Sequence, residues 1–167
     1  LKDASLELYE NCENGEWIPS SKTIRAFDDS DNLTLIEYWD YDETLKKWEG
    51  SSKIEYTLNT KGDILGYLGY EWENDNWKVS KKSENQYDNI GNMTLVHIWT
   101  VEDDGSLKDF SETGYGYDDQ GRKNMTAYYT YSSGVKMGTL KSEYVFNDKD
   151  QEIEKTTYQW STFDNNW

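Results

Sequence analysis

The sequence has very few of the residues from which most catalytic, metal and disulfide sites are built. It holds one histidine and one cysteine, so Cys12 has no partner for an internal disulfide and His97 would serve any histidine-dependent site alone. It also lacks a phosphate-binding loop, a dinucleotide fingerprint and a nucleophile elbow. We therefore predict a protein that is not an enzyme and that holds no cofactor.

Aliphatic residues are scarce as well. Leu, Ile, Val and Phe together account for 29 of the 167 residues, and so small a share beside a net charge of −16 is typical of disordered chains. The 8 Trp and 14 Tyr change that conclusion, because one aromatic side chain can bury about 150–250 Å². We expect a folded domain with an aromatic core.

Basic residues are outnumbered, with 17 Lys and Arg against 33 Asp and Glu. A chain of this charge repels the phosphates of nucleic acids and of anionic lipids. No stretch approaches the roughly 18–20 apolar residues with which a helix crosses a bilayer. We expect no nucleic-acid partner and no membrane insertion.

What the sequence does contain is an internal repeat. Its marker is an apolar or aromatic residue followed by Asp or Asn, and successive markers lie 31, 29, 30 and 29 residues apart. The five markers are Phe27-Asp28, Leu58-Asn59, Tyr87-Asp88, Tyr117-Asp118 and Phe146-Asn147. Three residues after the Asp or Asn stand Asp31, Gly62, Gly91, Gly121 and Asp150.

This marker is typical of a hairpin turn. Asp-x-x-Gly suits a type I turn closed by a residue with positive φ, because Asp caps the amides of the turn and Gly has no Cβ. We therefore expect one β-hairpin per repeat. Asp31 and Asp150 occupy the Gly position, and we expect them to be strained or to turn differently.

Aromatic residues recur at fixed distances from the marker. Eleven residues after the Asp or Asn stand Trp39, Tyr70, Trp99, Tyr129 and Tyr158, and thirteen residues after it stand Tyr41, Trp72, Tyr131 and Trp160. Strict alternation places these rings on one face of a sheet. The same alternation predicts the other face for Lys22, Lys53, Lys82 and Lys141 with Glu55, Glu84 and Glu143, as solvated ion pairs. We attribute the rings chiefly to packing between repeats.

These features predict an all-β fold. Helical periodicity is absent, and Tyr, Trp, Thr, Ile and Val favour strands. We expect an antiparallel meander of about eleven strands made of hairpin repeats, either as a curled, barrel-like sheet or as a single-layer twisted sheet. The strands are predicted near residues 5–11, 18–27, 32–41, 49–58, 63–73, 78–87, 92–101, 110–117, 122–131, 139–147 and 151–161.

The repeats also predict the organisation of the chain. We expect one β-repeat domain over residues 1–167, with a half repeat at 1–16 and full repeats at 17–47, 48–76, 77–106, 107–136 and 137–167. Trp167 falls where a further repeat would open. We therefore expect the array to belong to a longer chain.

Two segments resemble a known family. Residues 87–95 (YDNIGNMTL) and residues 117–122 (YDDQGR) resemble YD repeats, the tyrosine-aspartate repeats related to RHS repeats. The longer unit, with Ser51-Ser52-Lys53 before its marker and a Trp-rich second strand closing at Trp77, is similar to the longer variants found in secreted and cell-surface proteins of Bacteroidetes-type bacteria. The resemblance implies an extracellular or cell-surface β-repeat region and supplies no catalytic residue.

The first functional hypothesis is a non-catalytic, secreted or surface-displayed module that acts as an adhesive, a spacer or a binding scaffold, with a cell-surface glycan or protein as partner. The alternative is a carbohydrate-binding module that stacks sugars on exposed rings. Its candidate ligand-binding residues are Trp39, Tyr70, Trp72, Trp99, Tyr129, Tyr131, Tyr158 and Trp160. A glycoside-acting enzyme based on two carboxylates is a distant alternative.

Two smaller groups complete the candidates. His97 occupies a strand position that varies between copies, so we expect a surface or wall residue. Asp28, Asp29 and Asp31 supply the closely spaced carboxylates that calcium prefers, but the segment does not match an EF-hand loop. We favour plain turn chemistry for them and predict no metal.

Overall fold

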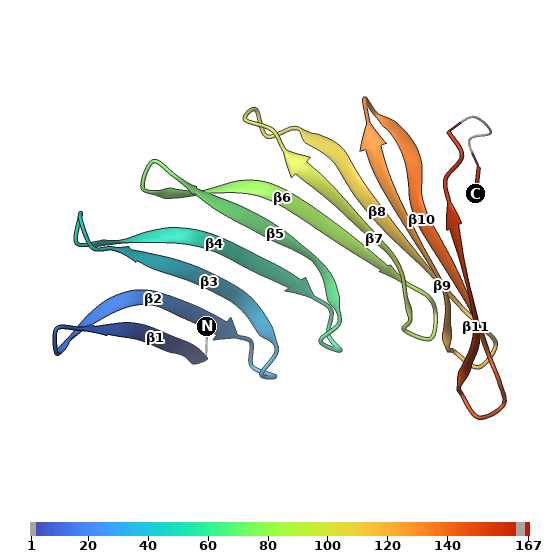
Figure 1. Cartoon of the computed structure of the whole chain (residues 1–167), viewed down its shortest axis with the longest axis horizontal. Helices are drawn as coiled ribbons and strands as arrows, with labels where there is room; N and C mark the ends of the chain where they lie inside the picture. Colours follow the sequence, from blue (N-terminus) through green and yellow to red (C-terminus); the bar gives the residue numbers. More distant parts are fainter. Residues whose placement is uncertain (1–2, 163–165) are drawn as a thin grey trace. The chain divides into compact units, whose positions relative to one another are not determined.

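The computed structural model describes residues 3–162 and 166–167, and they form an antiparallel β-sheet of eleven strands in chain order (Figure 1). The predicted all-β meander is therefore confirmed. The strands are β1 (Asp3–Glu13), β2 (Glu16–Phe27), β3 (Leu33–Asp42), β4 (Lys47–Leu58), β5 (Ile64–Glu73), β6 (Asn76–Tyr87), β7 (Met93–Val101), β8 (Leu107–Tyr117), β9 (Lys123–Ser132), β10 (Val135–Phe146) and β11 (Glu152–Gln159).

The strand order does not close on itself. Within the described residues β1 and β11 stand at the two ends of the order and are not paired with each other, so the barrel-like alternative is not formed. The same residues include no helix long and apolar enough to cross a membrane.

The chain divides into two compact units, Leu1–Lys82 and Ser83–Trp167, with the boundary inside β6. Within the first unit, β1 to β5 pair successively as antiparallel neighbours. Within the second, β7 to β11 do the same. Each strand in these series therefore contacts the strands that precede and follow it in the sequence.

The five marker turns share one geometry. In the third, the N–H of Asp88 donates to the carbonyl of Asn92 at 2.9 Å, and the N–H of Gly91 donates back to the carbonyl of Asp88 at 3.2 Å. The residue three places after the Asp or Asn has positive φ in every copy, from 59° at Asp150 to 96° at Gly91. The predicted turn is confirmed, and Asp31, with φ of 62°, adopts the same turn under strain instead of a different one.

The turns at the other end of the hairpins are shorter than we predicted, which lengthens the strands. Asn14-Gly15, Asn74-Asp75 and Ser133-Gly134 each form a two-residue connection in which both residues have positive φ. This is the type I′ geometry that matches the twist of paired strands. As a result β2 and β10 begin before the predicted residues 18 and 139.

A one-residue β-bulge follows each marker turn whose pairing is described. Phe27 pairs with Leu33, but the next pair is Ala26 with Leu35, so Thr34 is an extra residue on β3. The equivalent extra residues are Leu65, Asn124 and Ile153. A second bulge adds one residue to the strand that leads into the marker, at Ser20, Ser51, Phe110 and Thr139.

The first of these bulges makes the predicted division of faces wrong. Strict alternation put Lys53 on the face opposite to Tyr70, whereas the two residues pair directly across β4 and β5. Lys22 pairs with Trp39 in the same way. Directly paired residues project from the same face of an antiparallel sheet. The lysines therefore share a face with the rings, because the extra residue reverses the alternation of one strand relative to its partner.

We call the face of each unit that carries the repeated rings (Trp39, Tyr70, Trp99, Tyr129 and Tyr158) its ladder face, and the other its opposite face. Few residues of either face are fully buried. Among the described residues the buried hydrophobic ones are Ala26, Ile36 and Ala127, and no large side chain is completely buried. The predicted aromatic core is therefore a surface of half-buried rings.

Candidate binding surfaces

The ladder face of the first unit combines rings with ammonium and carboxylate groups. The Nζ atom of Lys53 lies 4.7 Å from the centre of the Tyr70 ring and 2.7 Å from a carboxylate oxygen of Glu55. The Tyr70 hydroxyl donates to the same carboxylate at 2.5 Å. Partial burial and this hydrogen bond raise the pKa of Tyr70 to about 12. Burial acts to raise the pKa of Glu55, but hydrogen bonds from Lys53 and Tyr70 outweigh it and lower that pKa.

Next to this group lies a cluster of three tryptophans. The ring centres of Trp39, Trp72 and Trp77 are 5.0–5.3 Å apart, with each pair packed edge to face. They cover Gly50, which pairs with Trp39; a Cβ atom there would lie 2.6 Å from the rings of Trp72 and Trp77. The glycine thus makes room for the cluster. Lys22 caps its edge, 4.9 Å from the centre of the Trp39 ring.

The second unit repeats both arrangements. Lys141 lies 5.2 Å from the centre of the Tyr158 ring, whose hydroxyl donates to Glu143 at 3.0 Å. Trp160 and Trp167 pack edge to face at 5.1 Å above another glycine, Gly138. Tyr129, which pairs with Gly138, contacts Trp167 at 5.7 Å. Ring, lysine, glutamate and glycine therefore form one recurring set.

Glu112 departs from this set, because it occupies the place that lysine holds in the other copies and pairs with Tyr129. Lys136 supplies the missing ammonium: its Nζ lies 4.2 Å from the centre of the Tyr129 ring and forms an ion pair with Glu112. The hydroxyl of Tyr131 donates to the same carboxylate. Burial acts to raise the pKa of Glu112, but these two donors outweigh it and lower that pKa.

His97 pairs with Glu112 across β7 and β8. Its ring stacks on Trp99 with 3.8 Å between centres and lies parallel to Tyr131 at 5.8 Å. Its Nδ1 is 3.6 Å from Glu112, and its Nε2 is 2.9 Å from Asp109. Nε2 makes no hydrogen bond within the described residues, so we treat the Asp109 contact as electrostatic. The side chain is 18% exposed, as a wall residue wedged between two rings.

All eight candidate ligand-binding residues lie on the ladder faces and are half-buried. The structure brings Trp39 and Trp72 together, Trp99 near Tyr131, and Tyr129 near the pair of Trp160 and Trp167. The remaining two, Tyr70 and Tyr158, lie beneath lysines. These rings are already engaged by ammonium groups or by other rings, and each such contact stabilises by about 0.5–1.5 kcal/mol.

The three calcium candidates serve the first marker turn. A carboxylate oxygen of Asp28 accepts the backbone N–H of Ser30 at 2.8 Å and of Asn32 at 2.9 Å. Hydrogen bonds from Asn32 lower the pKa of Asp28. Asp29 and Asp31 are exposed. Within the described residues no group of three or more His, Cys, Asp or Glu side chains is placed to hold a metal ion.

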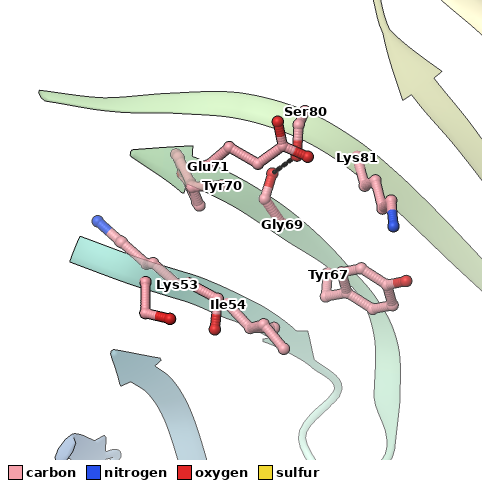
Figure 2. Close-up of a pocket in the computed structure, with 10 residues that line it drawn as sticks. Lys53, Ile54, Tyr67, Gly69, Tyr70, Glu71, Ser80 and Lys81 are labelled. Atoms are coloured by element: carbon pink, nitrogen blue, oxygen red, sulfur yellow. Dashed lines mark hydrogen bonds between the residues drawn. The ribbon is translucent and has the colours of Figure 1, made fainter. Parts of the chain in front are cut away.

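The opposite face of the first unit carries a hollow that the sequence analysis did not identify. Its volume is about 380 Å³, and side chains of β4, β5 and β6 line it around Gly69 (Figure 2). Ile54, which pairs with Gly69, and Tyr67 give it apolar walls. Glu71 and Lys81 lie at its rim and are exposed. The signal was present in the sequence: ten residues after the marker the other copies have Tyr38, Ile98, Tyr128 and Thr157.

Comparison with known proteins supports the fold alone. No family model matches the chain, and no curated protein matches it. The chain is similar to a solved structure of a protein of unknown function from Bacteroides fragilis, at 12% identity and a TM-score of 0.51 over 97% of this chain and 96% of that one. The resemblance to YD repeats therefore stays a prediction, and the eleven-stranded meander is the finding that the comparison supports.

Proposed function

We propose that the chain is a non-catalytic binding scaffold displayed outside the cell. The observation that carries this proposal is the exposure of apolar side chains on a sheet with almost no buried interior. Large exposed apolar surfaces on folded domains usually serve recognition. The internally bonded ladder supplies the rigidity that such a surface needs, because its rings and charged groups hold each other across neighbouring strands.

The arrangement of titratable groups supports a role without catalysis. The single histidine is wedged between Trp99 and Tyr131, and Glu112 is occupied by Lys136 and a tyrosine hydroxyl. A catalytic carboxylate or imidazole needs access to a reacting atom. The acidic composition and the resemblance to YD repeats support display outside the cell.

An adhesion assay tests the proposal. The exposed Cys12 is the only cysteine and accepts a fluorophore, and the labelled chain is passed over surfaces coated with polysaccharides, mucin-type glycoproteins or basic proteins. We expect saturable retention on at least one surface, loss of retention after unfolding, and no release of hydrolysis products. Absence of retention on every surface, or turnover of a coated glycan, would contradict the proposal.

Carbohydrate stacking on the eight aromatic candidates is the second function to test. Contacts on the ladder faces weigh against it, since Tyr70, Tyr129 and Tyr158 each already lie beneath a lysine ammonium. A titration with soluble glycans followed by Trp fluorescence decides the matter. A saturable change in emission that disappears in Trp72→Phe would establish stacking on the ladder face, and unchanged emission across the panel would exclude it.

A further inference from the structure

The hollow on the opposite face of the first unit is the imprint of a missing side chain. Gly69 stands ten residues after its marker, at the place where other copies have large side chains. Two of these, Tyr38 and Tyr128, stand out from the sheet with 40% and 46% of their surface exposed. Where the first and fourth copies present a ring, the second copy presents a space.

The backbone does not require glycine at this position. Gly69 has no positive φ, and it pairs regularly with Ile54 in the middle of the ladder between β4 and β5. Glycine inside a strand destabilises it by about 0.5–1 kcal/mol relative to alanine. A glycine kept there without a conformational reason is typical of a place where a ligand or another chain approaches closely. What Gly69 adds is therefore room.

The space is narrow at its floor. A Cβ atom on Gly69 would lie 3.3 Å from the Cβ of Lys81 and 3.6 Å from the ring of Tyr67. The hollow as a whole has a volume of about 380 Å³, which is at the small end of the range of about 300–1,000 Å³ for ligand sites. It therefore fits a single ring better than a chain of rings.

The lining has an apolar part and a polar part. Tyr67 and Ile54 offer the apolar walls, and Figure 2 shows Tyr67 and Lys81 beside each other, with Ser80 bonded to the carbonyl of Gly69 at 3.5 Å. Lys81 can donate to a hydroxyl oxygen, and Glu71 can accept a hydroxyl proton. Neither Lys81 nor Glu71 forms an ion pair within the part of the chain that the structure describes.

We propose that the hollow receives the ring of a tyrosine, or of a closely similar aromatic side chain, from a partner polypeptide. The inference rests on the proposed scaffold function and names the site and the chemistry of its partner. The ring takes the place that Tyr38 and Tyr128 fill in their own copies, and its hydroxyl meets Lys81 and Glu71. The partner is a different chain, because a net charge of −16 repels a second copy.

The experiment uses p-cresol, the side-chain analogue of tyrosine, and follows the backbone amides of the full chain by NMR. We expect saturable shifts around Ile54, Tyr67 and Lys81, with a dissociation constant on the order of 1 mM. Gly69→Tyr, which restores a side chain found in other copies, is expected to abolish these shifts. Gly69→Ala is expected to weaken binding several-fold. Gly114→Ala is the matched control, because a Cβ atom there meets nothing within 4 Å, and it should bind as the wild type does.

Three outcomes would overturn the inference. These are no saturable shifts up to about 20 mM p-cresol, shifts that persist in a folded Gly69→Tyr variant, and binding of methyl glucoside at these amides in preference to p-cresol. The last outcome would assign the hollow to a sugar. The adhesion assay separates the two proposals: retention that is unchanged in Gly69→Tyr would leave the scaffold function standing without this site, and p-cresol binding without retention would do the reverse.

Discussion

Single residues with a left-handed backbone set the quality of each marker turn. Gly62, Gly91 and Gly121 adopt positive φ freely, whereas Asp31 and Asp150 adopt it with a Cβ atom. Left-handed φ costs an L-residue about 1–2 kcal/mol, although Asp and Asn tolerate it better than most. Two of the five turns therefore carry strain that the other three lack.

Asp31→Gly should stabilise the chain. Relief of the backbone strain outweighs the extra freedom of glycine in the unfolded state, and we expect a net gain of about 0.5–1 kcal/mol in the free energy of unfolding. Urea denaturation measures it. Gly121→Ala is the reciprocal control, since a Cβ atom there meets no other atom within 4 Å and only φ is affected; it should lose about 1 kcal/mol or more. A loss in Asp31→Gly would show that the aspartate side chain matters more than φ.

Glu112 should make stability sensitive to acid. Its pKa is lowered in the folded chain, so the stabilisation it gives is complete above its unfolded value of about 4.3 and is lost as pH falls through the lower folded value. We expect Glu112→Gln to be less stable by about 1–3 kcal/mol at neutral pH and to lose stability less steeply below pH 5. Urea midpoints between pH 3 and pH 7 measure this, and the exposed Glu10→Gln is the control. Parallel pH profiles for wild type and Glu112→Gln would contradict it.

At the scale of strands, paired glycines and ring clusters depend on each other. Gly50 lies under Trp72 and Trp77, and Gly138 lies under Trp160 and Trp167. The rings pack down onto the backbone because no Cβ atom stands between them. This is the opposite of the usual weakening of a strand by glycine.

Gly50→Ala and Gly138→Ala should each destabilise the chain, by about 1–3 kcal/mol, because the new methyl group overlaps a ring. Gly114→Ala, at a strand glycine with open space, should be neutral or stabilise by up to about 1 kcal/mol. Urea denaturation followed by Trp emission gives all three values. Equal behaviour of Gly50→Ala and Gly114→Ala would mean that the tryptophan cluster shifts without loss.

The sequence was a good guide to strands and marker turns, and a poor guide to faces. Five copies of the marker fixed the turns, and Asp31 shows that the turn forms even without glycine. The bulge at Thr34 carries no residue signature, so strict alternation put Lys22 and Lys53 on the wrong face. The contacts of Glu112 depend on cross-strand register and on the reach of Lys136, which a periodic pattern does not contain.

At the scale of the whole molecule, each strand depends chiefly on its sequence neighbours, as in other repeat arrays. Deletion of residues 59–87 removes β5 and β6 and joins Leu58 to Asp88, which restores a complete marker turn. We expect a folded sheet of the nine remaining strands, with a lower urea m-value because less surface is exposed on unfolding. Far-UV circular dichroism and a urea titration check it. A chain that no longer unfolds cooperatively would show that the two units depend on this hairpin.

The bulges also bear on how such an array changes length over generations. The spacing of 31 residues between the first two markers and of 29 between the next two corresponds to a four-residue connection between β3 and β4 and a two-residue connection between β5 and β6. Codons have thus been gained or lost at the hairpin ends far from the markers. Loss of one codon at Thr34 would instead turn the strand over and exchange the inherited surfaces of the repeat, so we expect descendants of this gene to keep that length constant.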